Sequence, residues 1–458
     1  MAANYRPGHI LLSKLKALLH DDTARLMGRA VFMFVCRIVA AVTVIIMQVA
    51  LARWMGAEQL GIFIYSFAWC VLLAAIAGLG LPEAAFRFVG KGLASDDGDS
   101  ILSYAFFNSK TILYSGVIIA ATGCFLVTSV DGLVEAGTQN TFLIALVSVP
   151  VFALMMWFST LAQSFYRYRL AILPMLIFRP VILLLVVFII WAAGLSLSAI
   201  SVTTVHLCIM LPILFGQFYY LRSALRDQFP AAVVAGPQTR IWLRTAIPLL
   251  FSAFFVKYFL ELNVIMAGIY LPADQIAIFN ATFRSAFLIG FGVMAMDAIT
   301  APRVAELYGG DNLQELQRLV SQATTIKCLG AVFGVALLAV FGEFVLGLFG
   351  PEFVVGYRAL MILAVSQVIV AAFGAGTQLL TVSGNQDRCL VVFACSAAAL
   401  LVAHALLVPR FGLNGVAIAV LVVVTIQSFW INRIVVSRLG IYPSILNIGK
   451  PVSKLSAS

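Results

Sequence analysis

Long apolar runs separated by short polar segments make up most of this chain. Each run is close to the roughly 20 residues that a helix needs to cross a bilayer. The apolar positions are continuous rather than alternating, which favours membrane helices over the strands of a barrel. The pattern predicts about twelve spans, at 30–52, 60–81, 106–129, 141–163, 172–193, 199–221, 246–270, 276–299, 323–348, 358–382, 390–408 and 413–435.

Composition supports an all-α polytopic membrane protein. The 458 residues are 62% hydrophobic and 10% charged, whereas about a quarter of the residues of a soluble domain are charged. The seven cysteines contain no CxxC pair, and the chain has neither a P-loop nor a His/Cys cluster with metal spacing. We therefore expect no disulfide framework, no metal and no cofactor. The apolar stretch before the first span is broken by Lys14 and Lys16, and we expect it to form an amphipathic helix at the membrane surface.

The distribution of basic residues predicts the orientation. The net charge of +10 comes mostly from short loops at the ends of the spans, so it does not indicate nucleic-acid binding. With the N-terminus inside, 21 of the 29 Lys and Arg residues lie on the cytoplasmic side, 3 lie outside and 5 lie within or at the rim of spans. The positive-inside rule then places both termini in the cytoplasm. The outer loops are short, which leaves no room for an external catalytic domain, so we do not expect an enzyme.

Fragments of the first half recur in the second half at nearly constant spacing. Their offsets are 216, 220 and 218 residues, for the pairs 56–63 and 272–279, Pro82 and Pro302, and Gly194-Leu195 and Gly412-Leu413. These repeats predict two six-helix bundles related by a pseudo-twofold axis along the membrane normal, an arrangement that places a binding site between the halves. The expected divisions are a cytoplasmic amphipathic segment at 1–29, an N-lobe at 30–221, a cytoplasmic linker at 222–245, a C-lobe at 246–436 and a cytoplasmic tail at 437–458.

Charged residues inside the spans are the candidates for function, because a charge in hydrocarbon costs about 3 kcal/mol unless it is paired or faces a polar cavity. Arg284 lies in the middle of the eighth span, and its counterpart in the first repeat is Ala68, so the fold itself does not require a charge there. It either faces a cavity and attracts a ligand, or serves as an internal partner of Glu261 across the turn between the two spans. Lys257 and Glu261 are one helical turn apart. They either neutralise each other, or Lys257 meets an anionic ligand while Glu261 binds a proton or cation.

Two further arginines, Arg37 and Arg179, lie about 10 Å inside the cytoplasmic ends of their spans. Each either extends to the lipid headgroups or faces a cavity. Pro180 follows Arg179 and predicts a kink in that helix. Four cations are therefore predicted to bind the substrate at successive depths in the membrane: Arg37, Arg179, Lys257 and Arg284. The single acidic residue among these buried charges, Glu261, is predicted to couple transport to an ion.

Several patches of the chain form a recognisable set: Pro248-Leu249-Leu250, GIYLPADQIAIFNATFR (268–284), APRVAELYGGD (301–311), ALARWMGAEQLGIF (50–63), LFGPEF (348–353) and VPRFGLNGVAIA (408–419). Together they resemble the polysaccharide-unit flippases of the MOP exporter superfamily, which also contains the MATE drug antiporters and the lipid II flippases. The resemblance implies two MATE-like lobes and alternating access. It also implies an undecaprenyl-diphosphate-linked oligosaccharide as the substrate, flipped across the bacterial inner membrane for O-antigen, capsule or exopolysaccharide synthesis. Membrane lipids and the polymerase or chain-length proteins of the same pathway are the implied partners.

Two other functions remain as alternatives. A MATE-like, cation-coupled drug or metabolite antiporter would be expected to bury more carboxylates than cations, and this chain shows the reverse. A membrane-embedded polysaccharide polymerase or ligase would need a large outer loop that carries catalytic residues. The sequence leaves open whether a proton gradient, a sodium gradient, the membrane potential or removal of product drives transport.

Overall fold

The computed structural model describes residues 7–445 apart from 133, 136, 231–232, 235, 237–238 and 311. Side chains are described from residue 35 onward, except those of 251–256 and 386. Residues 1–6 and 446–458, the side chains of 7–34 and several positions of the 222–245 linker therefore lie outside the described part of the chain.

Every regular element in the described residues is helical. The first half contains α1 (Pro7–Ala77), α2 (Leu81–Ala94), α3 (Gly98–Ser129), α4 (Gln139–Val147), α5 (Val149–Ser164), α6 (Tyr168–Leu173), the π-helical turn η1 (Pro174–Phe178), α7 (Arg179–Ala192) and α8 (Ala199–Gln228). The second half contains α9 (Thr239–Lys257), α10 (Phe259–Gly268), α11 (Ala273–Gly309), α12 (Leu313–Phe349), the 3₁₀ turn η2 (Pro351–Gly356), α13 (Tyr357–Ala372), α14 (Gly376–Val382) and α15 (Gln386–Leu439).

The expected number of spans is confirmed. Nine helical stretches of the described chain are long and apolar enough to cross a membrane. Two of them, in α1 and α15, each hold two spans, because the chain turns at Gly56 and Gly412 with φ values of 78° and 55°, a conformation that glycine adopts at little cost. The apolar helix α10 continues α9 as one more interrupted span, which brings the described chain to twelve.

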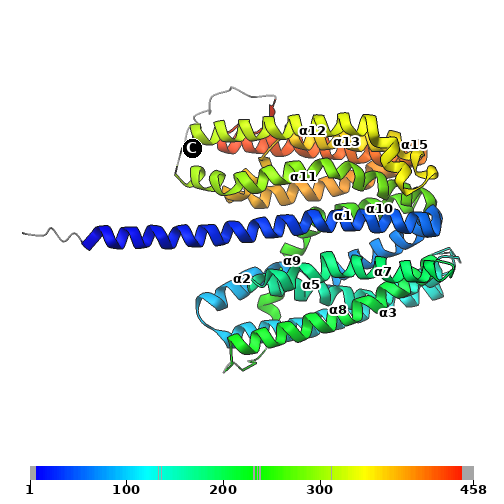
Figure 1. Ribbon diagram of the computed structural model, residues 1–458, viewed down its shortest axis with the longest axis horizontal. Coiled ribbons are helices and arrows are strands. Elements are labelled where there is room, and N and C mark those ends of the chain that lie inside the picture. The colour runs from blue at the N-terminus through cyan, green and yellow to red at the C-terminus, as the bar shows by residue number, and fades with distance from the viewer. Residues whose placement is uncertain are drawn as a thin grey trace, which may run out of the picture.

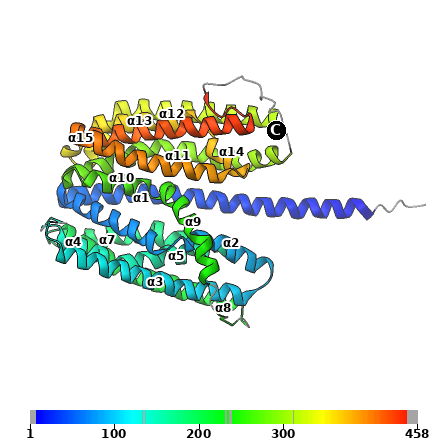
Figure 2. The same cartoon turned by 180° about the vertical axis from the view of Figure 1, so that it is seen from behind.

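The helices gather into two bundles with α1 between them. Figures 1 and 2 show α11 to α15 on one side and α2 to α8 on the other, with α9 crossing from one bundle to the other. Helix α1 packs against α10 and α11 in the second half and against α4, α5, α7 and α8 in the first. It is helical without a break from Pro7 to Gly56, so residues 7–29 continue the first span instead of forming a separate helix.

The repeated segments occupy equivalent places. Gly194 and Gly412 both have positive φ, at 75° and 55°, where the chain turns into a later span. The segments 56–63 and 272–279 meet each other at one end of the molecule, because a Cβ added to Gly61 would lie 1.7 Å from the carbonyl oxygen of Ala273. The two halves of the chain therefore have a duplicated architecture, and their repeated segments are in contact at this end of the molecule.

One charge differs from its expected place. The 21 basic residues that the positive-inside rule places on the cytoplasmic side include Lys327. In the structure it lies about 20 Å along α12, its side chain is 0% exposed, and it pairs with Asp297 of α11. At that depth the ammonium group does not reach the end of the helix, so the carboxylate on the neighbouring helix neutralises it. The pair stabilises the contact between α11 and α12.

Replacing Asp297 with Asn is expected to destabilise the protein by about 2–3 kcal/mol, because it leaves a buried ammonium without its counter-ion. We expect a smaller loss of unfolding free energy than for a fully buried pair, because the Asp297 side chain is 41% exposed. Thermal unfolding in detergent measures the effect. The double variant Asp297→Asn/Lys327→Met should recover most of the stability, and an unchanged unfolding temperature for Asp297→Asn alone would contradict the assignment.

Candidate functional site

A cavity of about 250 Å³ lies where α1 of the first half meets α10 and α11 of the second. Arg284 and Lys257 both line it, and α1 contributes Ala41 and Ile45. The remaining walls are largely aromatic, from Phe259, Phe283, Phe287 and Phe291. Two of the cations expected from the sequence therefore face a common space between the halves of the chain.

Neutral side chains hold Arg284 in place. Its Nε donates a hydrogen bond to Oδ1 of Asn280 at 3.0 Å, and the same oxygen accepts a hydrogen bond from Nε2 of Gln48 at 3.0 Å. Asn280 and Gln48 are both buried. This network ties α1 to α11 and orients the guanidinium without neutralising its charge.

Arg179 and Glu261 complete a charged centre with Arg284. The charges of these three residues lie within electrostatic reach of one another. The guanidinium of Arg179 lies 5.3 Å from the ring centroids of Phe67 and of Phe152, and its Nη1 has no hydrogen-bond partner among the described residues. In the described part of the chain Glu261 forms no ion pair. Two arginines and one carboxylate leave this centre with a net positive charge, as an anion-binding site requires.

The local chain conformation places Arg179 at this centre. Where a kink is predicted at Pro180, the helix contains the π-helical turn η1, which ends directly before Arg179. Proline has no N–H, and its ring clashes with the carbonyl group four residues earlier, so the preceding turn widens. Pro174 begins the same turn.

Lys257 pairs with a residue from a distant helix and not with Glu261. The proposed neutral pair with Glu261 does not form, because the helix is interrupted at Tyr258, with φ −111° and ψ 24°. Instead, Nζ of Lys257 lies 2.8 Å from Oε1 of Glu83 on α2. The Lys257 side chain remains 51% exposed, and it lines the cavity beside Arg284. The pair joins a helix of the second half to the first.

Exchanging the two charges of this pair tests its role. The single variants Glu83→Lys and Lys257→Glu are expected to reduce the transport predicted from the sequence at least fivefold, because each places like charges together across the contact. The stability change should stay within about 1 kcal/mol, since the lysine is largely exposed. In the double variant Glu83→Lys/Lys257→Glu transport should return to at least half the wild-type rate. A double variant as inactive as Lys257→Glu would show that Lys257 contacts the substrate instead.

Arg37 lies apart from this centre. It is exposed on α1 and is not among the residues that line the cavity at Arg284. Ala41, one helical turn farther along the same face, does line that cavity. Arg37 is therefore placed at the approach to the cavity, and its binding role stays a prediction.

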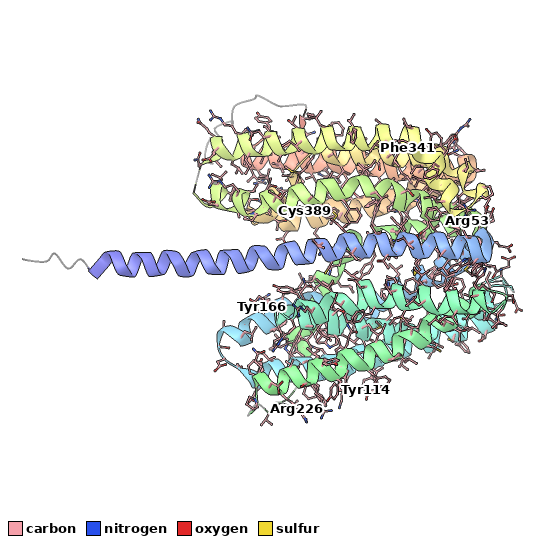
Figure 3. The ribbon with its side chains drawn as sticks, in the orientation of Figure 1. Arg53, Tyr114, Tyr166, Arg226, Phe341 and Cys389 are labelled. Atoms are coloured by element: carbon pink, nitrogen blue, oxygen red, sulfur yellow. The ribbon has the colours of Figure 1, made fainter. Side chains whose placement is uncertain are left out.

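At one end of the molecule the two halves are in close contact. Nε of Arg53 donates a hydrogen bond to the carbonyl oxygen of Leu348 at 2.8 Å, and its Nη2 donates to that of Gly347. Figure 3 shows Arg53 at this end and Arg226 toward the opposite end. Gly268 and Tyr65 also meet here, since a Cβ on the glycine would lie 2.2 Å from the tyrosine ring. The charged centre is therefore closed off at the Arg53 end.

Comparison with known proteins supports a transporter fold. Residues 248–407 match the MatE family model. Among curated proteins, the probable flippase AglR of Haloferax volcanii is 22% identical over 191 residues, which are 41% of this chain and 40% of that protein. The probable low-salt glycan biosynthesis flippase Agl15 of the same organism is 24% identical over 177 residues, 38% of this chain and 36% of that protein. The matched region thus spans about two fifths of each relative.

Solved structures share the fold over most of the chain. An inward-facing multidrug resistance MATE family transporter of the MOP superfamily superposes with a TM-score of 0.70 at 15% identity, covering 89% of this chain and 98% of that one. A MOP superfamily transporter from Pyrococcus furiosus, described by a binding pocket of reverse polarity, has a TM-score of 0.56 at 17% identity, covering 87% and 96%. Residues 248–407 of this multi-span membrane protein thus match the MatE family model, and most of the chain has the fold of the MATE transporter structures.

Proposed function

We propose that the protein flips an undecaprenyl-diphosphate-linked oligosaccharide across the bacterial inner membrane by alternating access. The observation that carries this proposal is the cavity between α1, α10 and α11, which Arg284 lines with its guanidinium held by neutral side chains. The charges of Arg179 and Glu261 lie within electrostatic reach of Arg284. A diphosphate carries at least two negative charges, and arginine binds phosphate oxygens bidentately. The centre thus offers the diphosphate a counter-charge where hydrocarbon offers none.

The cargo would enter from the end that carries the arginine-rich loops, which the positive-inside rule places in the cytoplasm together with both termini. The diphosphate would bind Arg284 and Arg179, while the lipid chain stays in the bilayer. Release on the other side requires the contacts around Arg53 and Gly61 to open. Glu261, which has no ion-pair partner in the described chain, is the candidate for coupling to a proton or cation.

Two curated relatives are named as flippases, one of them for glycan biosynthesis, and these names agree with a lipid-linked glycan as the substrate. The chain would then serve a polysaccharide pathway as a transporter without catalytic activity. The polymerase and chain-length proteins of that pathway would be its partners.

A cation-coupled drug antiporter is the second candidate, because the matching family model and the similar solved structures are those of MATE proteins. Two arginines at the centre would repel a cationic drug. The charge of the centre therefore favours the anionic cargo.

Reconstituted protein separates the two functions. In vesicles that hold the protein, a fluorescent diphosphate-linked oligosaccharide on a polyprenyl chain should move between leaflets, as measured by quenching with a membrane-impermeant reductant. A cationic dye should not accumulate when a proton or sodium gradient is applied. Dye transport without movement of the lipid-linked sugar would overturn the flippase proposal in favour of the antiporter.

A further inference from the structure

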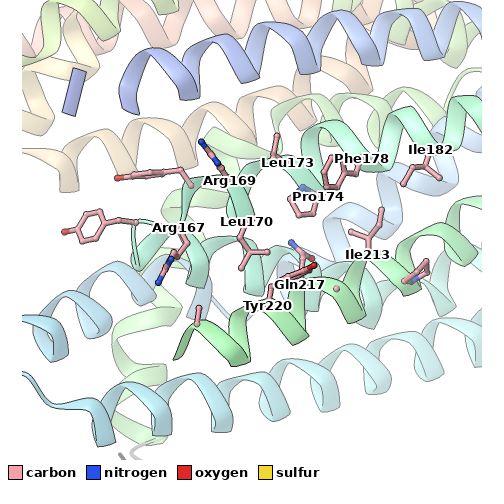
Figure 4. Close-up of a pocket in the computed structure, with 15 residues that line it drawn as sticks. Arg167, Arg169, Leu170, Leu173, Pro174, Phe178, Ile182, Ile213, Gln217 and Tyr220 are labelled. Carbon is pink, nitrogen blue, oxygen red and sulfur yellow. The ribbon is translucent and has the colours of Figure 1, made fainter. Parts of the chain in front are cut away.

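A second cavity, of about 1050 Å³, lies between the α6–η1–α7 segment and α8 of the first-half bundle. Figure 4 shows it as an elongated groove with the basic residues toward one end. Its lining combines apolar side chains with two arginines, including Leu170, Phe178, Ile182 and Ile213 with Arg167 and Arg169. We call this cavity the α7–α8 groove.

The α7–α8 groove faces outward from the bundle. Phe178, which is 48% exposed, and Ile182 lie one turn apart and line it, while Arg179 between them contacts Phe67 in the interior. An exposed apolar helix face in a membrane protein meets lipid chains. None of the residues that line the cavity at Arg284 also lines this groove.

The length of the groove matches one leaflet. Its lining along α8 runs from Pro212 to Ala224, a rise of about 18 Å. Half of the hydrocarbon core is about 15 Å thick. Three residues that leave room between the helices line it: Pro212 in α8, Pro174 at the start of the widened turn η1, and Gly216, which has no side chain.

The charge of the groove is concentrated at one end. Arg167 and Arg169 are exposed there, next to Tyr166 and Tyr168. No acidic residue is among the described side chains that line the groove. Tyrosine at the interface and basic pockets between membrane helices are the features that anchor anionic headgroups.

We propose that the α7–α8 groove binds a bilayer phospholipid with an anionic headgroup. Its phosphate lies at Arg167 and Arg169, and an acyl chain lies along α8. A bilayer lipid fits better than the lipid part of the cargo, because the diphosphate of a cargo carried between the halves would have to lie at Arg284 and not in a groove that is separate from that cavity. The bound lipid fills the space beside η1, the turn that orients Arg179, so anionic lipid stabilises this arrangement.

The charge requirement can be tested by thermal unfolding and by native mass spectrometry of the full chain. In vesicles, phosphatidylglycerol mixed into phosphatidylcholine should raise the unfolding temperature of the wild type, and lipid should remain bound in the mass spectrum. The double variant Arg167→Gln/Arg169→Gln should lose this rise and weaken phosphatidylglycerol binding at least tenfold. The matched control is Arg222→Gln/Arg226→Gln, which removes the same charge from exposed positions of α8 outside the groove and should behave as wild type.

Blocking the groove gives an independent test. Gly216→Leu adds a side chain where a Cβ would meet nothing within 4 Å, so it fills the groove without a clash. The variant should fold in phosphatidylcholine but lose the effect of phosphatidylglycerol, whereas Gly330→Leu, at an equally open position of α12, should keep it. Equal stabilisation of the arginine variant and the wild type would overturn the proposal. Stabilisation by a polyprenyl phosphate and not by phosphatidylglycerol would also overturn it and assign the groove to the cargo.

Discussion

Arg284→Gln is expected to lower the rate of movement of a diphosphate-linked cargo about 100-fold in reconstituted vesicles. Glutamine keeps a donor for the hydrogen bond to Oδ1 of Asn280, so the tie to α1 survives while the charge is lost. A hydrogen bond between charged groups contributes about 1.5–3 kcal/mol, and a paired arginine–phosphate contact makes two. Arg284→Lys should retain part of the activity, because a lysine keeps the charge but cannot bind bidentately.

The control for this variant is Arg318→Gln, at an exposed position of α12. It should transport at the wild-type rate. Thermal unfolding should be similar for wild type, Arg284→Gln and the control, which separates lost binding from lost folding. Wild-type transport by Arg284→Gln would rule out the anion-binding role of Arg284.

Gly61→Val is expected to reduce transport more than tenfold by preventing closure at the Arg53 end. The added Cβ would lie 1.7 Å from the carbonyl oxygen of Ala273, a backbone atom that no rotamer change can remove. The halves must separate by over an ångström at this contact. The free-energy cost of this separation shifts the population away from the closed arrangement. A transporter that alternates between two states loses flux when one of them becomes rare.

The state of the closed end can be read from Cys70, which is 1% exposed in the interior near Arg179. In a background where the other six cysteines are replaced, a maleimide reagent should label Cys70 faster in Gly61→Val than in the parent. Gly330→Val, at an open position, controls for the effect of a β-branched residue in a helix. Unchanged labelling together with wild-type transport would show that contact between Gly61 and Ala273 is not part of the transport cycle.

Hydropathy and short-range pattern were enough to predict the spans, the duplicated halves and the irregular turn at Pro180. The reason is that each depends on residues close in sequence. An apolar run must form all its backbone hydrogen bonds within one helix in lipid. Proline has no N–H to donate, so it perturbs the helix around it whatever the rest of the fold. The repeated segments 56–63 and 272–279 could likewise be recognised before their contact at Gly61 was known.

Charge pairing could not be predicted in the same way. Lys257 and Glu261 have the spacing of a helical pair, yet the break at Tyr258 separates them, and Glu83 from a distant helix approaches Lys257 instead. Lys327 is expected on the cytoplasmic side from the charge distribution along the chain, but its side chain lies in the interior and pairs with Asp297. Sequence spacing indicates partners only within one unbroken helix, whereas these pairs depend on how separate helices pack.

The sequence thus accounts for a membrane protein of about twelve spans in two related halves. It also indicates which cations lie too deep in the membrane to reach water easily. The packing of the helices establishes which of those cations act together. It brings Arg179 and Arg284 toward Glu261, leaves Arg37 at the approach, and gives Lys257 a partner from the other half. The packing also forms the α7–α8 groove, whose lining comes from two segments that are separate in the sequence. The physical reason is the distance in sequence over which each effect acts. Hydrophobic burial and proline geometry depend on residues that are close together in the chain, whereas ion pairs and cavities form between segments that are far apart in it.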